Sequence, residues 1–437
     1  MQSRRLYIAV AVLVVLGGLW YWSQRRQPSP ETSKASADTP PAVLKLDENS
    51  ITRVQLAKKD SQPLVIEKNG SGEWQIQAPK TLRADQSAVA GLVGTLASLN
   101  SERLVQDKDS NPAQYGLAQP ALEVDVSEKD NKSQKLLIGD ETPTGGAAYA
   151  MLGGDPRVFT IPGYTKTSLD KGVNDLRDKR LITLAAERVS RVQLIKKGQE
   201  IEFGRNKDEW QILKPMPLRA DSTQVGDLVR ELTEAKMNLS GTADNAAARF
   251  GKAAPLATAK VTDESGTQQL EIRKLKDDYS AKSSAVEGTY NVDSSLGKAV
   301  EKGLNDFRNK ALFDFGFAAP NKIEIHNSGK SYFLTRGTGG EDDWWSNGKK
   351  LDPLSVEDFI SKLRDLSATS FAESGFSRPE VEITVASNDS KRVESVSLSK
   401  QDDSYIAQRK GEPSLYKVSA TAVDDLLKAA EAIKPAK

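Results

Sequence analysis

Glu73-Trp74-Gln75-Ile76, followed by Pro79 and by Leu82-Arg83-Ala84-Asp85, is the stretch that decides the fold of this chain. The same pattern returns between Glu209 and Asp221 with its spacing intact. The two copies share these residues: Trp74, Pro79, Arg83 and Asp85 in the first, and Trp210, Pro215, Arg219 and Asp221 in the second. A spacing kept over a whole motif indicates that the chain is built from copies of one unit.

The residues around the first copy suggest what each motif position does. Before Trp74 the apolar residues alternate with polar ones, which is typical of a half-buried strand. After Asp85 the apolar spacing changes to that of a helix, which predicts Asp85 as the N-cap. We therefore interpret the tryptophans as core residues between sheet and helix, with Trp344 in a third copy. The alternative is that Arg83 and Arg219 bind an anion or a partner and that the tryptophans form stacking platforms.

Further strand and helix patterns divide the chain into three repeat units, at residues 43–185, 186–315 and 316–437. The third unit has diverged most from the other two. Each unit is expected to contain antiparallel strands and packing helices, which gives an α+β fold with three tandem repeats. Within the first unit we predict a closing helix at about 166–180. In the second, Phe250-Gly251 is expected to repeat the turn at Tyr115-Gly116.

The N-terminal segment predicts a membrane anchor. Residues 1–26 contain an uncharged apolar run from Leu6 to Trp22, close to the minimum of about 17 residues for a helix that crosses a bilayer. A cleaved signal peptide is the alternative, but the small-residue site at 35–37 lies far beyond the apolar run. We expect an uncleaved transmembrane signal anchor with a cytoplasmic tail, followed by a disordered tether at 27–42. The bulk of the chain is then extracytoplasmic, on a bacterial inner membrane.

The composition excludes several classes of site. Charged residues make up 28% of the 437 residues, and the formal charge of +1 lacks the basic excess that nucleic-acid binding requires. Cysteine is absent and His326 is the one histidine, which removes thiolate metal sites and most nucleophilic triads. We therefore predict no catalytic residue, no metal site, no bound cofactor and no nucleic-acid partner.

Trp345 is the candidate for partner binding. It follows Trp344 directly, and only one of two adjacent strand residues can face the core. If Trp344 takes the core position of the repeat motif, Trp345 is expected to point outward.

With the units in view, the chain resembles the bacterial domain of unknown function 4340 family. The first unit carries the pattern at Trp74–Asp85, Tyr115–Pro120 and Leu136–Tyr149. The second unit lacks the Ile-Gly-Asp segment, and the third keeps the outline of the pattern. The resemblance implies a membrane-anchored envelope protein with an accessory role beside an ABC-type transport system. It supplies no catalytic residues.

These observations leave two main hypotheses. In the first, the chain is a non-enzymatic scaffold that docks an integral-membrane transporter or another envelope protein. In the second, a groove between repeat units binds an envelope lipid or glycan. A hydrolase that uses carboxylates is a third and weaker hypothesis, because no pair of carboxylates recurs in the repeats.

Overall fold

The computed structural model describes residues 43–109, 111–129, 132–315, 320–337 and 343–436. The predicted anchor at 1–26 and the tether at 27–42 lie outside these residues. Every helix in the described part of the chain is too short or too polar to span a membrane. The chain divides into two compact units, with the boundary in the sequence between Asp178 and Lys179.

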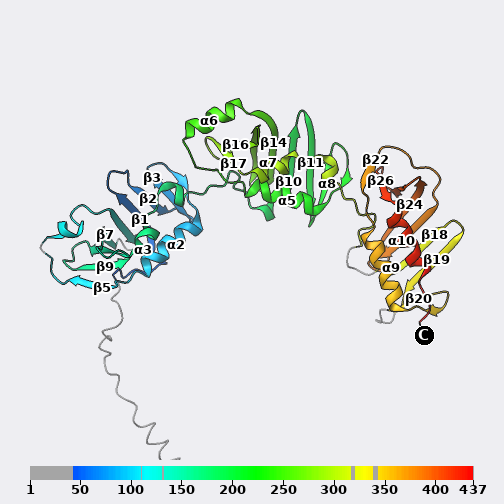
Figure 1. The fold of residues 1–437 in the computed structure, drawn as a ribbon, viewed down its shortest axis with the longest axis horizontal. Helices are drawn as coiled ribbons and strands as arrows, with labels where there is room; N and C mark the ends of the chain where they lie inside the picture. Colours follow the sequence, from blue (N-terminus) through cyan, green and yellow to red (C-terminus); the bar gives the residue numbers. More distant parts are fainter. Residues whose placement is uncertain (1–42, 110, 130–131, 316–319, 338–342, 437) are drawn as a thin grey trace, which may run out of the picture. The chain divides into compact units, whose positions relative to one another are not determined.

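The first unit contains one antiparallel sheet of nine strands, in the order β4-β3-β2-β1-β6-β7-β8-β9-β5 (Figure 1). Its strands are β1 Ile51–Lys58, β2 Leu64–Lys68, β3 Trp74–Ala78, β4 Leu82–Arg83, β5 Arg103–Gln106, β6 Leu122–Glu128, β7 Ser133–Glu141, β8 Ala147–Leu152 and β9 Val158–Pro162. Its helices are α2 Gln86–Ala97, the 3-10 turn η1 Pro112–Tyr115, α3 Gly163–Leu169 and α4 Val173–Leu176.

The second unit contains two sheets, of which the first has eight strands in the order β13-β12-β11-β10-β14-β15-β16-β17. Its strands are β10 Arg191–Lys196, β11 Gln199–Asn206, β12 Glu209–Lys214, β13 Leu218–Arg219, β14 Ala254–Asp263, β15 Gly266–Leu275, β16 Asp278–Ser283 and β17 Thr289–Val292. Its helices are the 3-10 turn η3 Ala186–Arg188, α5 Ser222–Thr233, α6 Ala243–Lys252, α7 Ser294–Glu301 and α8 Leu304–Phe307.

The third sheet of the chain again has nine strands, in the order β21-β20-β19-β18-β23-β24-β25-β26-β22. Its strands are β18 Lys322–Asn327, β19 Lys330–Arg336, β20 Trp344–Ser346, β21 Lys349–Lys350, β22 Ser370–Ala372, β23 Val381–Ser387, β24 Arg392–Gln401, β25 Ser404–Arg409 and β26 Leu415–Ser419. Its helices are α9 Pro353–Asp365 and α10 Ala420–Glu431. The predicted α+β class with three repeated sheets is therefore confirmed.

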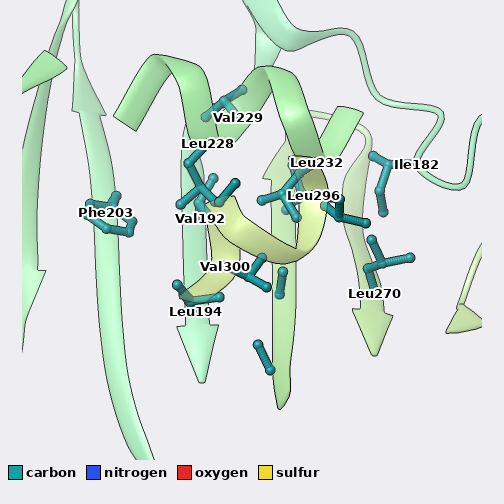
Figure 2. Close-up of a cluster of buried hydrophobic side chains, with 14 of the residues drawn as sticks. Ile182, Val192, Leu194, Phe203, Leu228, Val229, Leu232, Leu270, Leu296 and Val300 are labelled. Carbon is teal, nitrogen blue, oxygen red and sulfur yellow. The ribbon is translucent and has the colours of Figure 1, made fainter. Parts of the chain in front are cut away.

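Helices cover one face of each sheet, and the other face is open except in the second sheet, where α6 lies on it and Phe250 contacts Arg273 of β15. Alternate strand residues join the buried cluster that also contains the apolar stripe of the first helix. In the second sheet, Leu228, Val229 and Leu232 of α5 pack with Leu296 and Val300 of α7 over the strands (Figure 2). Burial of such side chains contributes roughly 1.5–3 kcal/mol each, which explains why the helical stripe recurs in every repeat. The opposite strand residues are mostly polar and form the open face.

Two local predictions are wrong. The helix expected over 166–180 is two short helices, because the N–H of Gly172 donates to the carboxylate of Asp175 at 2.7 Å and starts α4 anew. The turn expected at Phe250-Gly251 is the end of α6, whose N-cap Thr242 accepts a hydrogen bond from the N–H of Asn245. Residues good at forming helices, mostly alanine, precede Phe250 and extend the helix through it.

Candidate functional site

The motif tryptophans lie in the core. Trp74, Trp210 and Trp344 occupy β3, β12 and β20 and are 6–9% exposed. The N–H of Trp74 donates to Oε1 of Gln86 at 2.8 Å, and Nε2 of Gln86 donates back to the carbonyl of Trp74 at 2.9 Å. These bonds connect the start of β3 to the first turn of α2.

The motif aspartates cap those helices. Oδ1 of Asp85 accepts the N–H groups of Ser87 and Ala88 at 3.0 and 3.1 Å. Asp221 does the same for the first turn of α5, and Asp352 caps α9. Each cap is worth about 1 kcal/mol. Pro79 and Pro215, which precede these segments, both follow cis peptide bonds.

The backbone beside each aspartate binds the chain that leaves the last helix of the same repeat. Ala84 forms a bridge with Arg177, and Ala220 forms the equivalent bridge with Arg308. The N–H of Asp221 donates to the carbonyl of Phe307 at 2.8 Å. In the third repeat the same place is taken by Leu351, which forms a bridge with Pro435. The motif therefore closes each repeat onto its own end.

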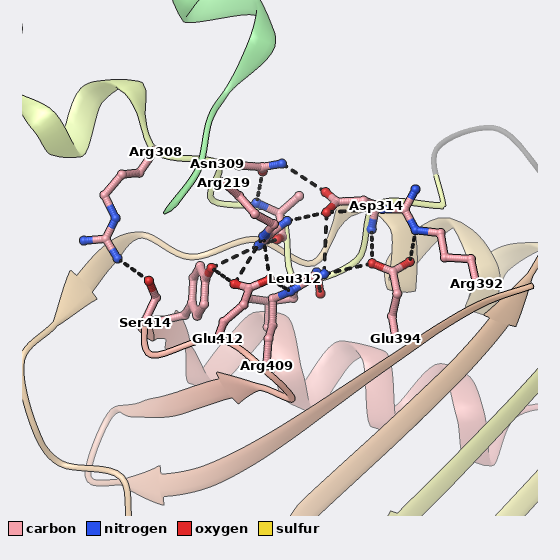
Figure 3. Close-up of polar contacts among 12 residues, drawn as sticks. Arg219, Arg308, Asn309, Leu312, Asp314, Arg392, Glu394, Arg409, Glu412 and Ser414 are labelled. Carbon is pink, nitrogen blue, oxygen red and sulfur yellow. Dashed lines mark hydrogen bonds and ion pairs between the residues drawn. The ribbon is translucent and has the colours of Figure 1, made fainter. Parts of the chain in front are cut away.

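The side chain of Arg219 connects the motif of the second repeat to residues of the third repeat (Figure 3). Its guanidinium contacts Oδ2 of Asp314 at 2.6 Å and Oε1 of Glu412 at 3.0 Å. It also donates to the carbonyl of Ala311 at 2.6 Å and to the hydroxyl of Tyr416 at 3.1 Å. Glu412 and Tyr416 belong to the third repeat, so one motif arginine connects the second sheet to the third.

A second arginine completes this arrangement from within the third sheet (Figure 3). Arg409 contacts Oε1 of Glu394 at 3.0 Å and Oε1 of Glu412 at 2.8 Å, and it donates to the carbonyl of Leu312. The N–H of Asp314 donates to the same Glu394 oxygen at 3.0 Å. We call this set the joint cluster, and its members are Arg219, Asp314, Glu394, Arg409, Glu412 and Tyr416.

Opposite charges compensate one another in the joint cluster. Burial acts to lower the pKa of Arg219, but the carboxylate of Asp314 and the contacts with Tyr416 and Glu412 outweigh it and raise that pKa. Burial raises the pKa of Tyr416, against the opposing effect of Arg219. The guanidinium and the phenol therefore both stay protonated at neutral pH. The carboxylates have arginine partners, so the chemistry of the cluster is that of a structural ion network.

The chain segment between the second and third sheets is bonded on both sides. The N–H of Asn309 donates to the carbonyl of Arg219 at 3.0 Å. Its neighbour Lys310 accepts the N–H of Ala368 at 2.8 Å, and the N–H of Leu312 donates to Leu366 at 3.0 Å. Consecutive residues of the linker thus bind the second sheet and then the third repeat.

A cleft of about 530 Å³ lies beside the joint cluster. Trp210, Arg219 and Asp221 line it from the second sheet, and Arg364 and Arg392 line it from the third repeat. The carboxylates of Glu209, Asp221 and Asp314 line the same cleft, so three arginines and three carboxylates face it and their formal charges balance.

Trp345 lies where the sequence pattern placed it. It is 41% exposed on the open face of the third sheet, opposite Thr335 of β19, whereas Trp344 is 6% exposed. Phe333 is exposed on the same face, two residues from Thr335. His326 lies on β18, with its Nδ1 2.8 Å from Oγ of Ser331. These side chains form a partly aromatic surface, and the binding role of Trp345 stays a prediction.

Arg83 has a different environment from Arg219. Its guanidinium is 3.4 Å from Asp178, and its side chain is 37% exposed. In the third repeat the equivalent position is Lys350, whose ammonium is 2.6 Å from Asp343. Of these three equivalent side chains, Arg219 in the second repeat is therefore the one that belongs to the joint cluster.

Within the described residues, no group of three or more His, Asp or Glu side chains could hold a metal ion.

Another buried carboxylate with cationic partners, Glu202, lies on the polar face of the second sheet. Glu202 is 4% exposed and contacts Lys214 and Arg191, each at 2.9 Å. The hydrogen bond from Lys214 lowers the pKa of Glu202, against the effect of burial, with Gln193 and Arg191 adding to the lowering.

This environment predicts a pH-dependent contribution to stability. Because the pKa of Glu202 is lower in the folded chain, its contribution is present above the ordinary value of 4.5 and is lost as the pH falls below it. We expect Glu202→Gln to reduce the free energy of unfolding by about 1–2 kcal/mol at pH 7, with a smaller difference from wild type at pH 3.5. Urea unfolding at both pH values measures this. Glu200→Gln, which alters a more exposed partner of Lys214, is the control, and equal effects of the two variants would contradict the prediction.

The sequence did not indicate most of the joint cluster. Arg219 was recognised as a motif residue, but its partners lie about 90 to 200 residues further along the chain. The repeated arginine at 83 and 219 was the available signal. Nothing in the local pattern of Asp314, Arg409 or Glu412 marks them as its partners.

The comparisons with known proteins agree with this description. The model of a family described as a domain of unknown function (DUF4340) matches residues 74–213 and again 210–379. Both matches begin at a motif tryptophan, and they confirm the resemblance and its tandem arrangement. No curated protein matches the chain. Among solved structures, the chain is similar to a DNA polymerase sliding clamp from Pseudomonas aeruginosa, with 9% identity over 86% of this chain and 93% of that chain. The TM-score of 0.18 is too low to support an argument.

Proposed function

The chain belongs to the DUF4340 family, and from this premise we propose that it is a non-enzymatic scaffold anchored in a bacterial inner membrane. In this proposal residues 1–26 form the anchor, residues 27–42 form the tether, and the repeats lie outside the cytoplasm. The scaffold docks an integral-membrane protein, most simply a component of an ABC-type transport system.

The observation that supports the proposal is that the repeated motif residues have structural roles. Its tryptophans fill cores, its aspartates cap helices, and Arg219 binds the second sheet to the third. Residues that recur along the chain thus build and connect the repeats. A chain built from such repeats is suited to present several surfaces to a partner.

Trp345 is the proposed contact with the partner. An exposed tryptophan on a sheet supplies a large apolar area, and tryptophan is enriched among the residues that dominate protein interfaces. Its neighbour Phe333 enlarges the surface, and Lys350 lies opposite Trp345 on β21.

The test is recovery of the partner from cells. A photo-crosslinking amino acid at position 345, followed by purification in mild detergent, should yield an integral-membrane protein. Trp345→Ala should reduce the recovery of that protein by about tenfold, as expected for an interface residue worth over 1 kcal/mol. Tyr164→Ala is the matched control, because Tyr164 is an aromatic residue with 76% exposure on α3. Recovery of no membrane protein by either method would contradict the proposal.

The second candidate function is binding of an envelope lipid or glycan. The cleft beside the joint cluster supports it, because Trp210, three arginines and three carboxylates line a space of about 530 Å³. The arginines suit the anionic groups of lipid headgroups and acidic sugars, and the tryptophan suits stacking on a sugar ring. Saturable binding of a labelled anionic lipid or an acidic glycan, weakened by Arg364→Met, would favour this function over docking.

A further inference from the structure

A cleft of about 600 Å³ lies on the open face of the third sheet. It is lined by His326 of β18, by Glu382 and Thr384 of β23, by Ser395 and Ser397 of β24, and by the chain from Gln408 to Glu412. Among the described residues, it shares no lining residue with the cleft beside the joint cluster. It is therefore a separate place on the molecule.

The polar side chains of this cleft are aligned across neighbouring strands. The strand register places one polar residue from each of four strands in a single row, namely His326, Glu382, Ser397 and Gln408. Thr384 and Ser395 belong to the adjacent row, and their hydroxyls are 3.0 Å apart. Ile383 and Val396, which precede Thr384 and follow Ser395, are 0–1% exposed and point into the core. Polar side chains therefore form the floor of the cleft.

Several of these polar groups have hydrogen-bonding capacity to spare. Within the described part of the chain, the amide of Gln408 and the ammonium of Lys410 have no hydrogen-bond or ion partner. The carboxylate of Glu382 accepts one long bond, from Ser397 at 3.5 Å. A carboxylate accepts, an ammonium donates, and amides and hydroxyls do both. The cleft therefore offers donors and acceptors together, and its two carboxylates balance its lysine and arginine in formal charge.

The corresponding faces of the other two sheets differ from this one. On the first sheet the ammonium of Lys135 contacts Glu123 at 2.5 Å and Asp125 at 3.5 Å, so polar groups of that face pair with one another. On the second sheet α6 lies over the face, where Phe250 contacts Arg273. The mixed polar cleft is therefore a property of the third repeat, the one that has diverged most in sequence.

The groups in the cleft indicate the class of ligand. Each strand of its floor is paired on both sides, so it has no free backbone edge for an added peptide strand. The balanced charges do not favour an anion. A molecule with many neutral hydroxyls can pair with donors and acceptors alike. Beside His326 lies the exposed ring of Phe333, with ring centroids 5.7 Å apart, and such rings pack well on the C–H face of a sugar.

We propose that this cleft binds a neutral oligosaccharide. Gln408 and Glu382 form hydrogen bonds with its hydroxyls, and the rings of His326 and Phe333 pack on one sugar unit. The row of four side chains spans three strand spacings, or roughly 14 Å, which suits several linked sugars. This site goes beyond the proposed docking role, because it gives the scaffold a carbohydrate ligand without using Trp345.

Two neutral trisaccharides, chitotriose and maltotriose, are the probes for this site. Each is titrated into the untagged full-length chain in a detergent that has no sugar headgroup. His326 is the one histidine of the chain, so the ring signals of a histidine-labelled sample report on this cleft by NMR without further assignment. We expect at least one trisaccharide to shift these signals in a saturable way.

Gln408→Leu is the test variant, because it removes the amide with little change in volume. It should weaken binding about fivefold or more, as expected for the loss of one hydrogen bond. Gln75→Leu is the matched control, since Gln75 is a partly buried glutamine between inward-facing residues of β3, and it should bind the sugar as wild type does. Trp345→Ala and Arg364→Met should also leave binding unchanged.

The proposal is overturned if neither trisaccharide shifts the His326 signals, or if Gln408→Leu binds as tightly as wild type. It is also overturned if Arg364→Met weakens binding and Gln408→Leu does not, which would place the sugar beside the joint cluster. Recovery of a membrane protein by crosslinking at position 345 is a separate measurement. The docking role therefore stands or fails independently of this site.

Discussion

Replacing Gly139 with alanine is expected to destabilise the first unit by at least about 3 kcal/mol, because the new methyl group would overlap the backbone. A Cβ at Gly139 would lie 2.1 Å from the carbonyl oxygen of Tyr115 and 3.1 Å from the backbone carbon of Gly116. Both neighbours are main-chain atoms, so no side-chain rotation relieves the overlap. Urea unfolding, followed by hydrogen exchange of β7 and η1, measures the loss.

The control for this prediction is Gly91→Ala in the same unit. Gly91 lies within α2, and a Cβ there meets no atom within 4 Å. We expect this variant to be neutral or to gain up to about 1 kcal/mol, from the higher helix propensity of alanine. Similar stabilities of the two variants would show that the contact of Gly139 with Tyr115 is unimportant.

The contact between Gly139 and Tyr115 joins two segments of the family pattern, Tyr115–Pro120 and Leu136–Tyr149. Gly116 has φ of 70°, and a Cβ there would lie 2.6 Å from the carboxylate of Asp140. The Tyr-Gly turn therefore packs directly onto the Gly-Asp pair of β7, where the pairing with β8 is irregular. Tyr115 completes the contact, with its ring 4.8 Å from that of Tyr149. The second repeat lacks the Gly-Asp pair and has α6 in place of the turn.

Arg219→Met is expected to reduce the free energy of unfolding of the second unit by about 2–4 kcal/mol. Removing the guanidinium leaves Asp314 without its nearest cation, leaves Glu412 with Arg409 as its remaining arginine partner, and removes the donor to the carbonyl of Ala311. Breaking a buried ion network in this way costs more than the network contributes, because the carboxylates stay desolvated. Chemical unfolding at neutral pH, with hydrogen exchange at Asn309 and Leu312, measures the effect.

Arg83→Met provides the matched control. The same motif position in the first repeat is more exposed, and its ion pair with Asp178 has a separation of 3.4 Å. Because Arg83 is partly exposed and its contact with the buried Asp178 is long, we expect a smaller loss than for Arg219, of about 1 kcal/mol. If both arginine variants lost the same stability, the joint cluster would have no special role.

The sequence predicted the repeated parts of the fold because they depend on local patterns. Strand alternation and the helical stripes gave three α+β repeats, and the aspartates before the stripes are the caps in the structure. The break at Gly172 and the extension of α6 through Phe250 depend on single residues inside otherwise helical sequence. The joint cluster depends on contacts between distant segments, which no local pattern specifies.

The linker between the second and third sheets has a mechanical consequence. Asn309 and Lys310 are adjacent, yet one is bonded to Arg219 and the other to Ala368. No residue lies between these two hydrogen-bonded positions. Tension along the chain would therefore pass directly from the bond with Arg219 to the bond with Ala368. The ion contacts of Arg219 would bear part of the same load. Pulling on this unit should therefore show a rupture at the joint, and Arg219→Met should lower the force at which it occurs.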